Sequence, residues 1–150
     1  MKKLLITVLL ALAISSVTTQ VALANAAVEF RQSAMTVFVW YLKPMGGMAK
    51  GKIPFDQTAF ANNAQGLATA TRLDIPAGFP KGSYDEEESD AKPAIWEKWS
   101  EFEGKYRDLQ KQAAKLAEVA QGGDVAAMKA QFGATAKTCG SCHKPFRSKK

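Results

Sequence analysis

The chain's two cysteines and its single histidine lie together in the segment Cys139-Gly140-Ser141-Cys142-His143. In a C-x-x-C-H segment the two thiols add to the two vinyl groups along one edge of a porphyrin, and the following imidazole binds the iron. On a helix, Cys139 and His143 share one face because they are four residues apart. The motif therefore predicts one covalently attached c-type haem with His143 as its axial ligand.

Three other uses of the same residues have to be weighed. A disulfide is common in exported proteins, but two cysteines this close on a helix give tight geometry, and His143 would have no role. A thioredoxin-like pair begins a helix beside a sheet, whereas this pair ends a helical pattern. A zinc site needs four ligands, and the segment offers three with no second cluster elsewhere. Haem attachment is favoured because the pentapeptide is itself the attachment signature.

Residues 1–24 have the pattern of a cleaved secretory signal peptide. Two lysines follow Met1, an uncharged apolar run covers residues 4–14, and Ala22-Leu23-Ala24 is a small-x-small cleavage signal, with residues 24–26 as a second candidate. The alternative, a membrane anchor, needs about 20 apolar residues, more than this run supplies. The pattern predicts export to the periplasm and no membrane attachment after cleavage.

Removal of this leader from the 150-residue chain leaves residues 25–150, a length that suits one domain. Two lysines leave with it, so 18 of the 20 basic residues remain against 14 acidic ones, and the net charge falls from +6 to +4. Basic residues gather at the C-terminus, which could suit nucleic acid, but an exported protein meets little of it and the acidic run 85–88 balances the surface. We expect a solvated surface with a weak preference for anionic partners and no nucleic-acid binding.

Apolar residues recur every three or four positions in four stretches, and no strand-like alternation is convincing. The second stretch begins with Asp56 and the fourth with Asp124, both good helix N-caps, while Pro44 should kink the first helix. Inward aromatics, among them Phe60 and Phe102, would form walls for a porphyrin, and of the pair Trp96 and Trp99 we expect at least one to be exposed. The helices are expected over about 28–49, from 56 to about 71, over 93–121 and over 124–146.

The connections between the first and second helices and between the third and fourth are short, which favours antiparallel neighbours. The segment 74–92 is the one long loop, and loops of this length are often functional or are crossover connections. The predicted fold is therefore all-α, an antiparallel up-down-up-down four-helix bundle.

Four segments give the chain a resemblance to a known family over essentially its whole mature length. They are Phe30-Arg31-Gln32-Ser33-Ala34-Met35, the stretch 44–56 with its M-G-x-M-x-K-G pattern, Ala91-Lys92-Pro93-Ala94-Ile95-Trp96, and the C-terminal C-x-x-C-H-x-x-x-R of 139–147. Together they resemble the cytochromes c′, the class II c-type cytochromes. The haem motif alone is shared by many families, but its C-terminal position combined with the 44–56 stretch is specific.

The resemblance implies a role for each of the other site residues. Arg31 and Gln32 would point toward a haem propionate, Met35 would lie over the distal face of the haem, and Arg147 would lie close to the imidazole of His143. It also implies a five-coordinate, high-spin iron that binds NO or CO, one-electron exchange with redox partner proteins, and a homodimer formed through the first and second helices. Because no second histidine remains as a distal acid or base, we expect no peroxidase activity and no enzyme.

Several alternatives stay open. Met35 could instead be the sixth iron ligand of a low-spin electron carrier, although as a flexible apolar side chain it could simply pack against the porphyrin. Arg31 and Gln32 could belong to a solvated helix face. Arg147 could simply be a basic residue that interacts favourably with the dipole at the C-terminal end of its helix. A haem-free thiol or metal-binding bundle is the remaining hypothesis.

Overall fold

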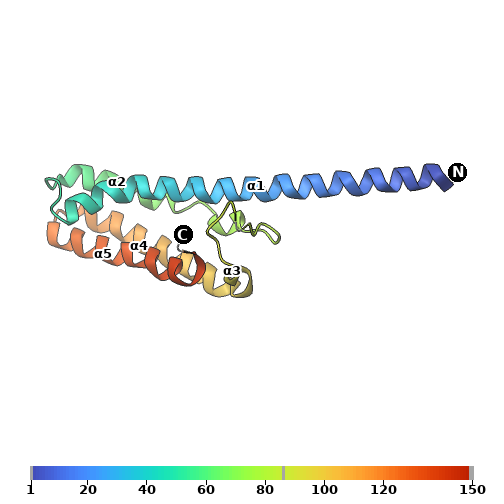
Figure 1. Cartoon of the computed structure of the whole chain (residues 1–150). Coiled ribbons are helices and arrows are strands. Elements are labelled where there is room, and N and C mark those ends of the chain that lie inside the picture. Colours follow the sequence, from blue (N-terminus) through green and yellow to red (C-terminus); the bar gives the residue numbers. More distant parts are fainter. Residues whose placement is uncertain (1, 86, 149–150) are drawn as a thin grey trace.

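The computed structural model of the chain describes residues 2–85 and 87–148, and their side chains from Ala24 onward. Apart from one isolated bridge between Ala91 and Arg147, the described residues contain helices, turns and loops only. The helices are α1 (Lys2–Ala49), α2 (Gln57–Ala70), the 3-10 turn η1 (Ile75–Gly78), α3 (Ala94–Glu97), α4 (Trp99–Gln121) and α5 (Val125–Phe146), shown in Figure 1.

The four long helices form the predicted antiparallel bundle. α4 packs along both α2 and α5, and α1 packs along α2, whereas α1 and α5 touch much less. Figure 1 shows the two connections α1–α2 and α4–α5 at the same end of the bundle, with the long loop and α3 toward the other end. The bundle is therefore closed on three sides and opens between α1 and α5.

Both predicted N-caps are confirmed. The Asp56 carboxylate accepts from the Ala59 N–H at 2.9 Å, and the Asp124 carboxylate accepts from the N–H groups of Ala126 and Ala127 at 2.8 and 3.2 Å. Each cap satisfies amide groups that the first helical turn leaves free. The helices that follow bury their apolar stripes: Phe60, Ala64 and Leu67 from α2, and Met128, Phe132 and Thr135 from α5.

The first helix was predicted to start near Val28, and this start is wrong, because the backbone of α1 is one continuous helix from Lys2 to Ala49. No glycine or proline precedes Pro44, so nothing in the sequence breaks the helix across the predicted leader. Pro44 lies inside α1, which continues to Ala49. The side chains of residues 1–23 lie outside the described part, and the cleavage of residues 1–24 stays a prediction.

The prediction of a single helix over 93–121 is wrong, because the helix is interrupted at Lys98. This residue has φ −121° and ψ 46° and separates α3 from α4. The indole N–H of Trp96 donates to the carbonyl oxygens of Phe79 and Pro80, at 3.0 and 3.2 Å. These bonds hold α3 against the long loop. Because Trp96 packs on Phe79 and Trp99 on Phe102, both indoles are half-buried, and the expectation of an exposed one is also wrong.

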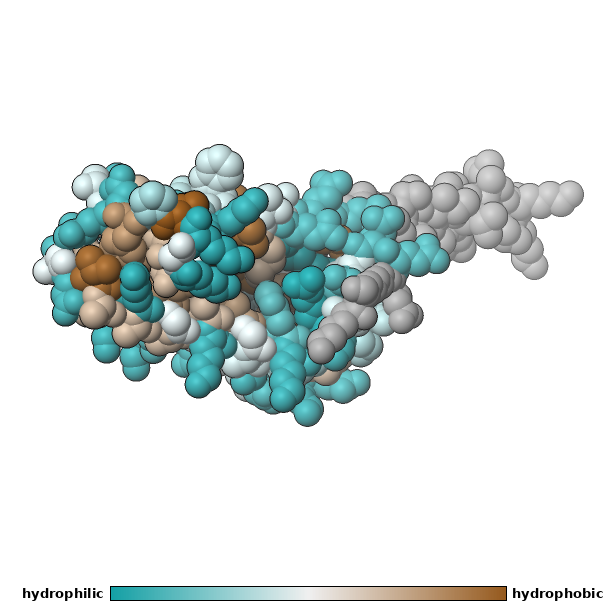
Figure 2. Space-filling model, turned by 60° about the vertical axis from the view of Figure 1, so that its left-hand side comes forward, coloured by the Kyte–Doolittle hydropathy of each residue, from teal (hydrophilic) through white to brown (hydrophobic). Residues whose placement is uncertain are grey.

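The surface of the bundle is mixed. In Figure 2, which brings the α1–α2 connection forward, hydrophilic side chains alternate with weakly apolar ones, and the strongly hydrophobic ones are scattered. Within the part whose side chains are described, no helix is both long and apolar enough to cross a membrane.

Gly66 sets how closely α2 approaches α1. A Cβ built at Gly66 would overlap the Tyr41 ring, with Cδ1 at 2.7 Å. We expect Gly66→Ala to lower the free energy of unfolding by about 1–3 kcal/mol, the usual cost of overpacking, as measured by urea denaturation. The control is Gly104→Ala in α4, where a Cβ meets nothing within 4 Å and the helix should gain about 1 kcal/mol. A Gly66→Ala protein as stable as the parent would contradict the close α1–α2 packing.

Candidate cofactor-binding site

A cavity of about 620 Å³ lies where α1 and α5 diverge. Its walls are mostly apolar and come from α1, the long loop, α4 and α5. They include Met35, Phe38 and Leu42 from α1, Ile75 and Phe79 from the loop, and Phe102, Tyr106 and Leu109 from α4. A cavity of this size between packed helices is far larger than the gaps a protein core normally tolerates, so it fits a large, flat, apolar group.

The three residues of the C-x-x-C-H motif line this cavity from α5. Cys139, Cys142 and His143 are half-buried, and both thiols are free rather than joined in a disulfide. Burial raises the pKa of the Cys139 thiol and raises that of Cys142 to about 11. Burial and the charge of Arg147 lower the pKa of His143, so the imidazole is neutral at pH 7 and has a lone pair for a metal.

A zinc site is not supported by the geometry. Among the described residues, no three histidine, cysteine, aspartate or glutamate side chains are grouped so that they could hold a metal ion. A porphyrin brings its own iron and four nitrogen ligands, so it needs only an axial ligand from the protein.

Met35 reaches the cavity from the α1 wall, whereas His143 comes from the α5 wall. Met45, Met48 and Met128 are buried in the core and do not line the cavity. Of the methionines whose side chains are described, Met35 alone could approach an iron that His143 holds. A half-buried thioether there can fill the space beside the iron or bind it.

Arg31 is buried at the edge of the cavity, with 3% of its surface exposed. Its Nη1 donates to the Gly78 carbonyl and the Ser83 hydroxyl, at 3.0 and 3.1 Å. Its Nη2 donates to the Ser83 carbonyl and the Ser89 hydroxyl, at 2.9 and 3.0 Å. The guanidinium also lies 4.7 Å from the centre of the Phe79 ring. Arg31 therefore does not sit on a solvated helix face.

The charge of Arg31 is only partly compensated. Burial lowers its pKa, and the charge of Asp85 opposes this shift, but no carboxylate of the described residues forms an ion pair with it. Its Nε is buried and has no hydrogen-bond partner in the described part of the chain. A buried cation without a close anion is costly, so this edge of the cavity fits a group that carries carboxylates. Haem, with its two propionates, is such a group.

Gln32 and Arg147 lie at the rim of the same cavity. The Gln32 amide donates to the Glu88 carbonyl at 2.7 Å. The Arg147 Nε lies 3.5 Å from the Asp90 carboxylate, and the Arg147 N–H donates to the His143 carbonyl at 2.9 Å. The positive charge of Arg147 also lowers the pKa of the His143 imidazole.

All seven residues singled out in the sequence therefore meet at one cavity. The loop residues Glu87–Ala91 and the α4 residue Lys105 also line this cavity, and they were not predicted from the sequence. The length of the loop was the one available signal. Its position over the cavity depends on hydrogen bonds to α1 and α5, which lie more than 50 residues away along the chain from Ser89.

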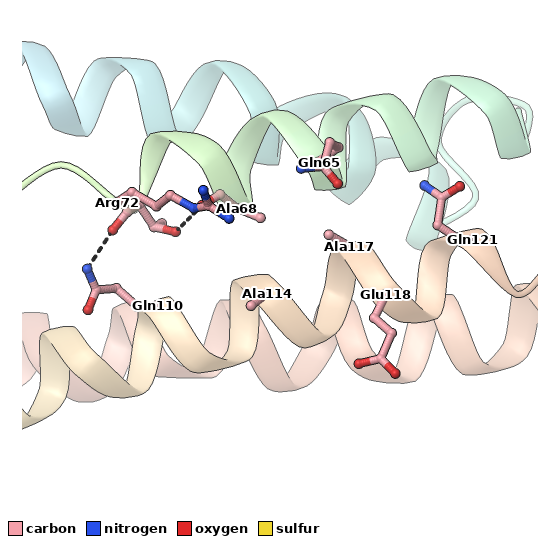
Figure 3. A pocket seen from close by; sticks show the side chains of 9 residues that line it. Gln65, Ala68, Arg72, Gln110, Ala114, Ala117, Glu118 and Gln121 are labelled. Atoms are coloured by element: carbon pink, nitrogen blue, oxygen red, sulfur yellow. Dashed lines mark hydrogen bonds between the residues drawn. The ribbon is translucent and has the colours of Figure 1, made fainter.

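A second cavity of about 420 Å³ lies between α2 and α4. Figure 3 shows its alanines, Ala68, Ala114 and Ala117, with glutamines at both ends. The Gln110 amide donates to the Thr71 carbonyl at 2.8 Å. None of the residues lining it is a cysteine, histidine or methionine.

The comparisons with known proteins agree with this geometry. A family model described as cytochrome c′ matches residues 26–147. Cytochrome c-554 of Cereibacter sphaeroides is 37% identical over 124 residues, which is 81% of this chain and 92% of that protein. The structure of cytochrome c′ from Shewanella frigidimarina superposes with a TM-score of 0.80 at 32% identity, over 84% of this chain and 97% of the other.

A third relative was solved with a ligand. It is the nitric oxide complex of a variant of cytochrome c′ from Alcaligenes xylosoxidans, which superposes with a TM-score of 0.76 at 32% identity. The match covers 85% of this chain and 97% of that one.

Proposed function

The chain belongs to the cytochrome c′ family, and we propose that it is an exported haem protein that binds NO or CO at a five-coordinate, high-spin iron and also exchanges single electrons. The family carries covalently attached c-type haem, and this chain has the cysteine pair for it. One observation carries the proposal: the thiols and imidazole from α5 and the thioether from α1 line the same mostly apolar cavity of about 620 Å³.

Each site residue has a role that its environment supports. Cys139 and Cys142 would anchor the porphyrin to α5, and His143 would bind the iron as a neutral imidazole. The haem, when bound, supplies an iron that takes up one electron and binds a small diatomic molecule. Arg31 and Gln32 would lie toward a propionate, and Arg147 would limit the anionic character of the imidazole.

The α1 wall decides which ligands can enter. Apolar side chains surround Met35, and burying an unpaired charge among them is expensive, so neutral diatomic molecules are favoured over anions. The four Nη hydrogens of Arg31 are all used within the protein. With the chain's single histidine on the α5 wall, no imidazole remains as a proton donor on the α1 side, and the proposed role is binding and electron exchange rather than catalysis.

The alternative is a low-spin electron carrier in which the Met35 sulfur is the sixth iron ligand. The position of Met35, the one described methionine on the cavity wall, favours it. Such a protein needs only an exposed haem edge and a docking surface for its redox partner.

Anaerobic titration of the reduced, exported and purified protein with NO tests the proposal. We expect saturation at one NO per chain, followed by the change in the haem absorption spectrum. A protein whose spectrum does not respond to NO would refute the open site, and a colourless protein would refute haem binding altogether.

We also propose that the mature protein begins at residue 25 and works in the periplasm. The family match begins at residue 26, just after the predicted cleavage site, which supports a leader that is not part of the functional bundle. The basic n-region and apolar run support export through the secretory pathway.

We further propose a homodimer that forms through α1 and α2. Trp40 is 74% exposed and Val37 is 41% exposed, and they lie three residues apart on one face of α1. Two exposed apolar side chains on one helix face, one of them a tryptophan, suit an interface, because tryptophan is enriched among the residues that contribute most to binding.

Trp40→Glu should weaken this dimer. Loss of an aromatic anchor at an interface typically costs 2 kcal/mol or more, so we expect the dimer dissociation constant to rise about 30-fold or more, measured by sedimentation equilibrium. Tyr84→Glu, at a 42% exposed loop position, is the matched control and should leave it unchanged. A Trp40→Glu protein that dimerises as tightly as the parent would place the interface elsewhere.

A further inference from the structure

The segment 87–92, called the strap below, crosses the edge of the cavity between α1 and the end of α5. At α1 it is held by Gln32, which donates to Glu88, and by Arg31, which donates to Ser89. At α5 it is held by two backbone bonds: the Lys92 N–H donates to the Phe146 carbonyl at 3.0 Å, and the Ser148 N–H donates to the Asp90 carbonyl at 2.7 Å. The strap therefore has a fixed position relative to both cavity walls.

The guanidinium of Arg31 has one N–H group left over. A guanidinium has five N–H groups, and the four on Nη1 and Nη2 are used on Gly78, Ser83 and Ser89. The fifth, on Nε, is buried and unpartnered within the described chain. Among the described residues Asp85 forms neither an ion pair nor a hydrogen bond with this group, and its Oδ1 accepts from the N–H groups of Glu87 and Glu88.

The hydroxyl group of Ser89 has a hydrogen that is free to donate a hydrogen bond. Its side chain is buried, with 7% of the residue exposed, and it lines the cavity. The hydroxyl oxygen accepts from Arg31 Nη2 at 3.0 Å and from the Ala91 N–H at 3.2 Å. A hydroxyl has two acceptor positions and one donor, so both acceptor positions are occupied and the O–H is free to donate.

We propose that Ser89 is a haem-binding residue, whose O–H joins the Nε–H of Arg31 in holding one haem propionate. The inference rests on the proposed haem function and adds a contact from the strap to it. A carboxylate has two oxygens, so it can accept from both donors, and hydrogen bonds to an ionised acceptor are about twice as strong as neutral ones. The same carboxylate supplies the anion that the buried Arg31 lacks. Ser83 also accepts from Arg31, but it does not line the cavity.

Resonance Raman spectroscopy of the purified haem protein tests this. Because each hydrogen bond restrains the bending of a propionate, we expect Ser89→Ala to shift one propionate bending band to lower frequency. Ser89→Thr, which keeps the hydroxyl, should restore the parent frequency. Ser83→Ala is the matched control, since it also removes an acceptor for Arg31 but no donor to the cavity, and it should leave the band in place.

Two results would overturn the assignment of Ser89. One is an unchanged propionate band in Ser89→Ala. The other is an equal shift in Ser83→Ala, which would mean that both serines act only by holding Arg31. If Ser89→Ala does not accumulate, Ser89→Cys provides the same comparison with a weaker donor. Failure of the proposed function is distinguishable, because then the parent protein itself would show no haem bands.

Discussion

Replacing both Cys139 and Cys142 with serine is expected to abolish covalent haem attachment and to deplete the folded protein. The thiols line the cavity from α5 and nothing else in the described chain offers a covalent anchor there. Serine keeps the size of the side chain but not the nucleophilic sulfur. Haem staining after denaturing electrophoresis should give a strong band for the parent chain and none for the double variant.

The loss of folded protein follows from the size of the cavity. Without the cofactor, the mostly apolar walls of this cavity of about 620 Å³ are exposed to water, which disfavours the folded state. Since a typical domain is stable by only about 5–15 kcal/mol, we expect less folded protein when no haem is attached. Ser141→Ala is the control, because Ser141 lies inside the motif, is exposed and carries no reactive group. Full haem staining of the double variant would contradict the site.

Met35→Ala is expected to speed the binding of CO and NO. If the thioether fills the space beside the iron, an entering molecule must displace it. Displacing a packed side chain costs about 1–3 kcal/mol, so its removal should raise the association rate about 5- to 150-fold. Stopped-flow mixing of the reduced protein with CO measures this rate directly.

The same variant separates the two candidate functions. If Met35 binds the iron, the parent protein is low-spin, and Met35→Ala turns it high-spin. If Met35 only fills space, both proteins are high-spin and differ in rate alone. Val39→Ala, which also removes methyl groups from the cavity wall, is the control and should change the rate little. An unchanged rate in a high-spin Met35→Ala protein would show that Met35 is not the gate.

The sequence predicted those elements whose signals are local. Asp56 and Asp124 cap helices because the bonds they form lie within three residues of each cap. The stripe from Met128 to Phe146 follows from helical spacing alone. The break at Lys98 could not be predicted this way, because it accompanies bonds from Trp96 to the loop carbonyls of Phe79 and Pro80, and those partners meet only in the folded bundle.

The site residues, too, divide into those that a local sequence pattern reveals and those that only the fold reveals. The C-x-x-C-H motif is contiguous, and the resemblance of the first-helix segment pointed to Arg31, Gln32 and Met35, so the sequence led to residues from both walls. It did not lead to Ser89, because an isolated serine in a long loop has no distinguishing pattern. Ser89 becomes informative only in the fold, where its hydroxyl lies 3.0 Å from Nη2 of Arg31, a guanidinium whose buried Nε–H has no partner in the described chain.

The absorption spectrum of the exported, purified protein, recorded oxidised, reduced, and reduced with CO, tests the central claim most directly. An open iron site between His143 and Met35 predicts a broad high-spin Soret band in the reduced protein that shifts sharply when CO is added. Sharp, split low-spin α and β bands that do not change when CO is added would contradict it. They would mean that the iron is six-coordinate and that the protein is an electron carrier without an open ligand site.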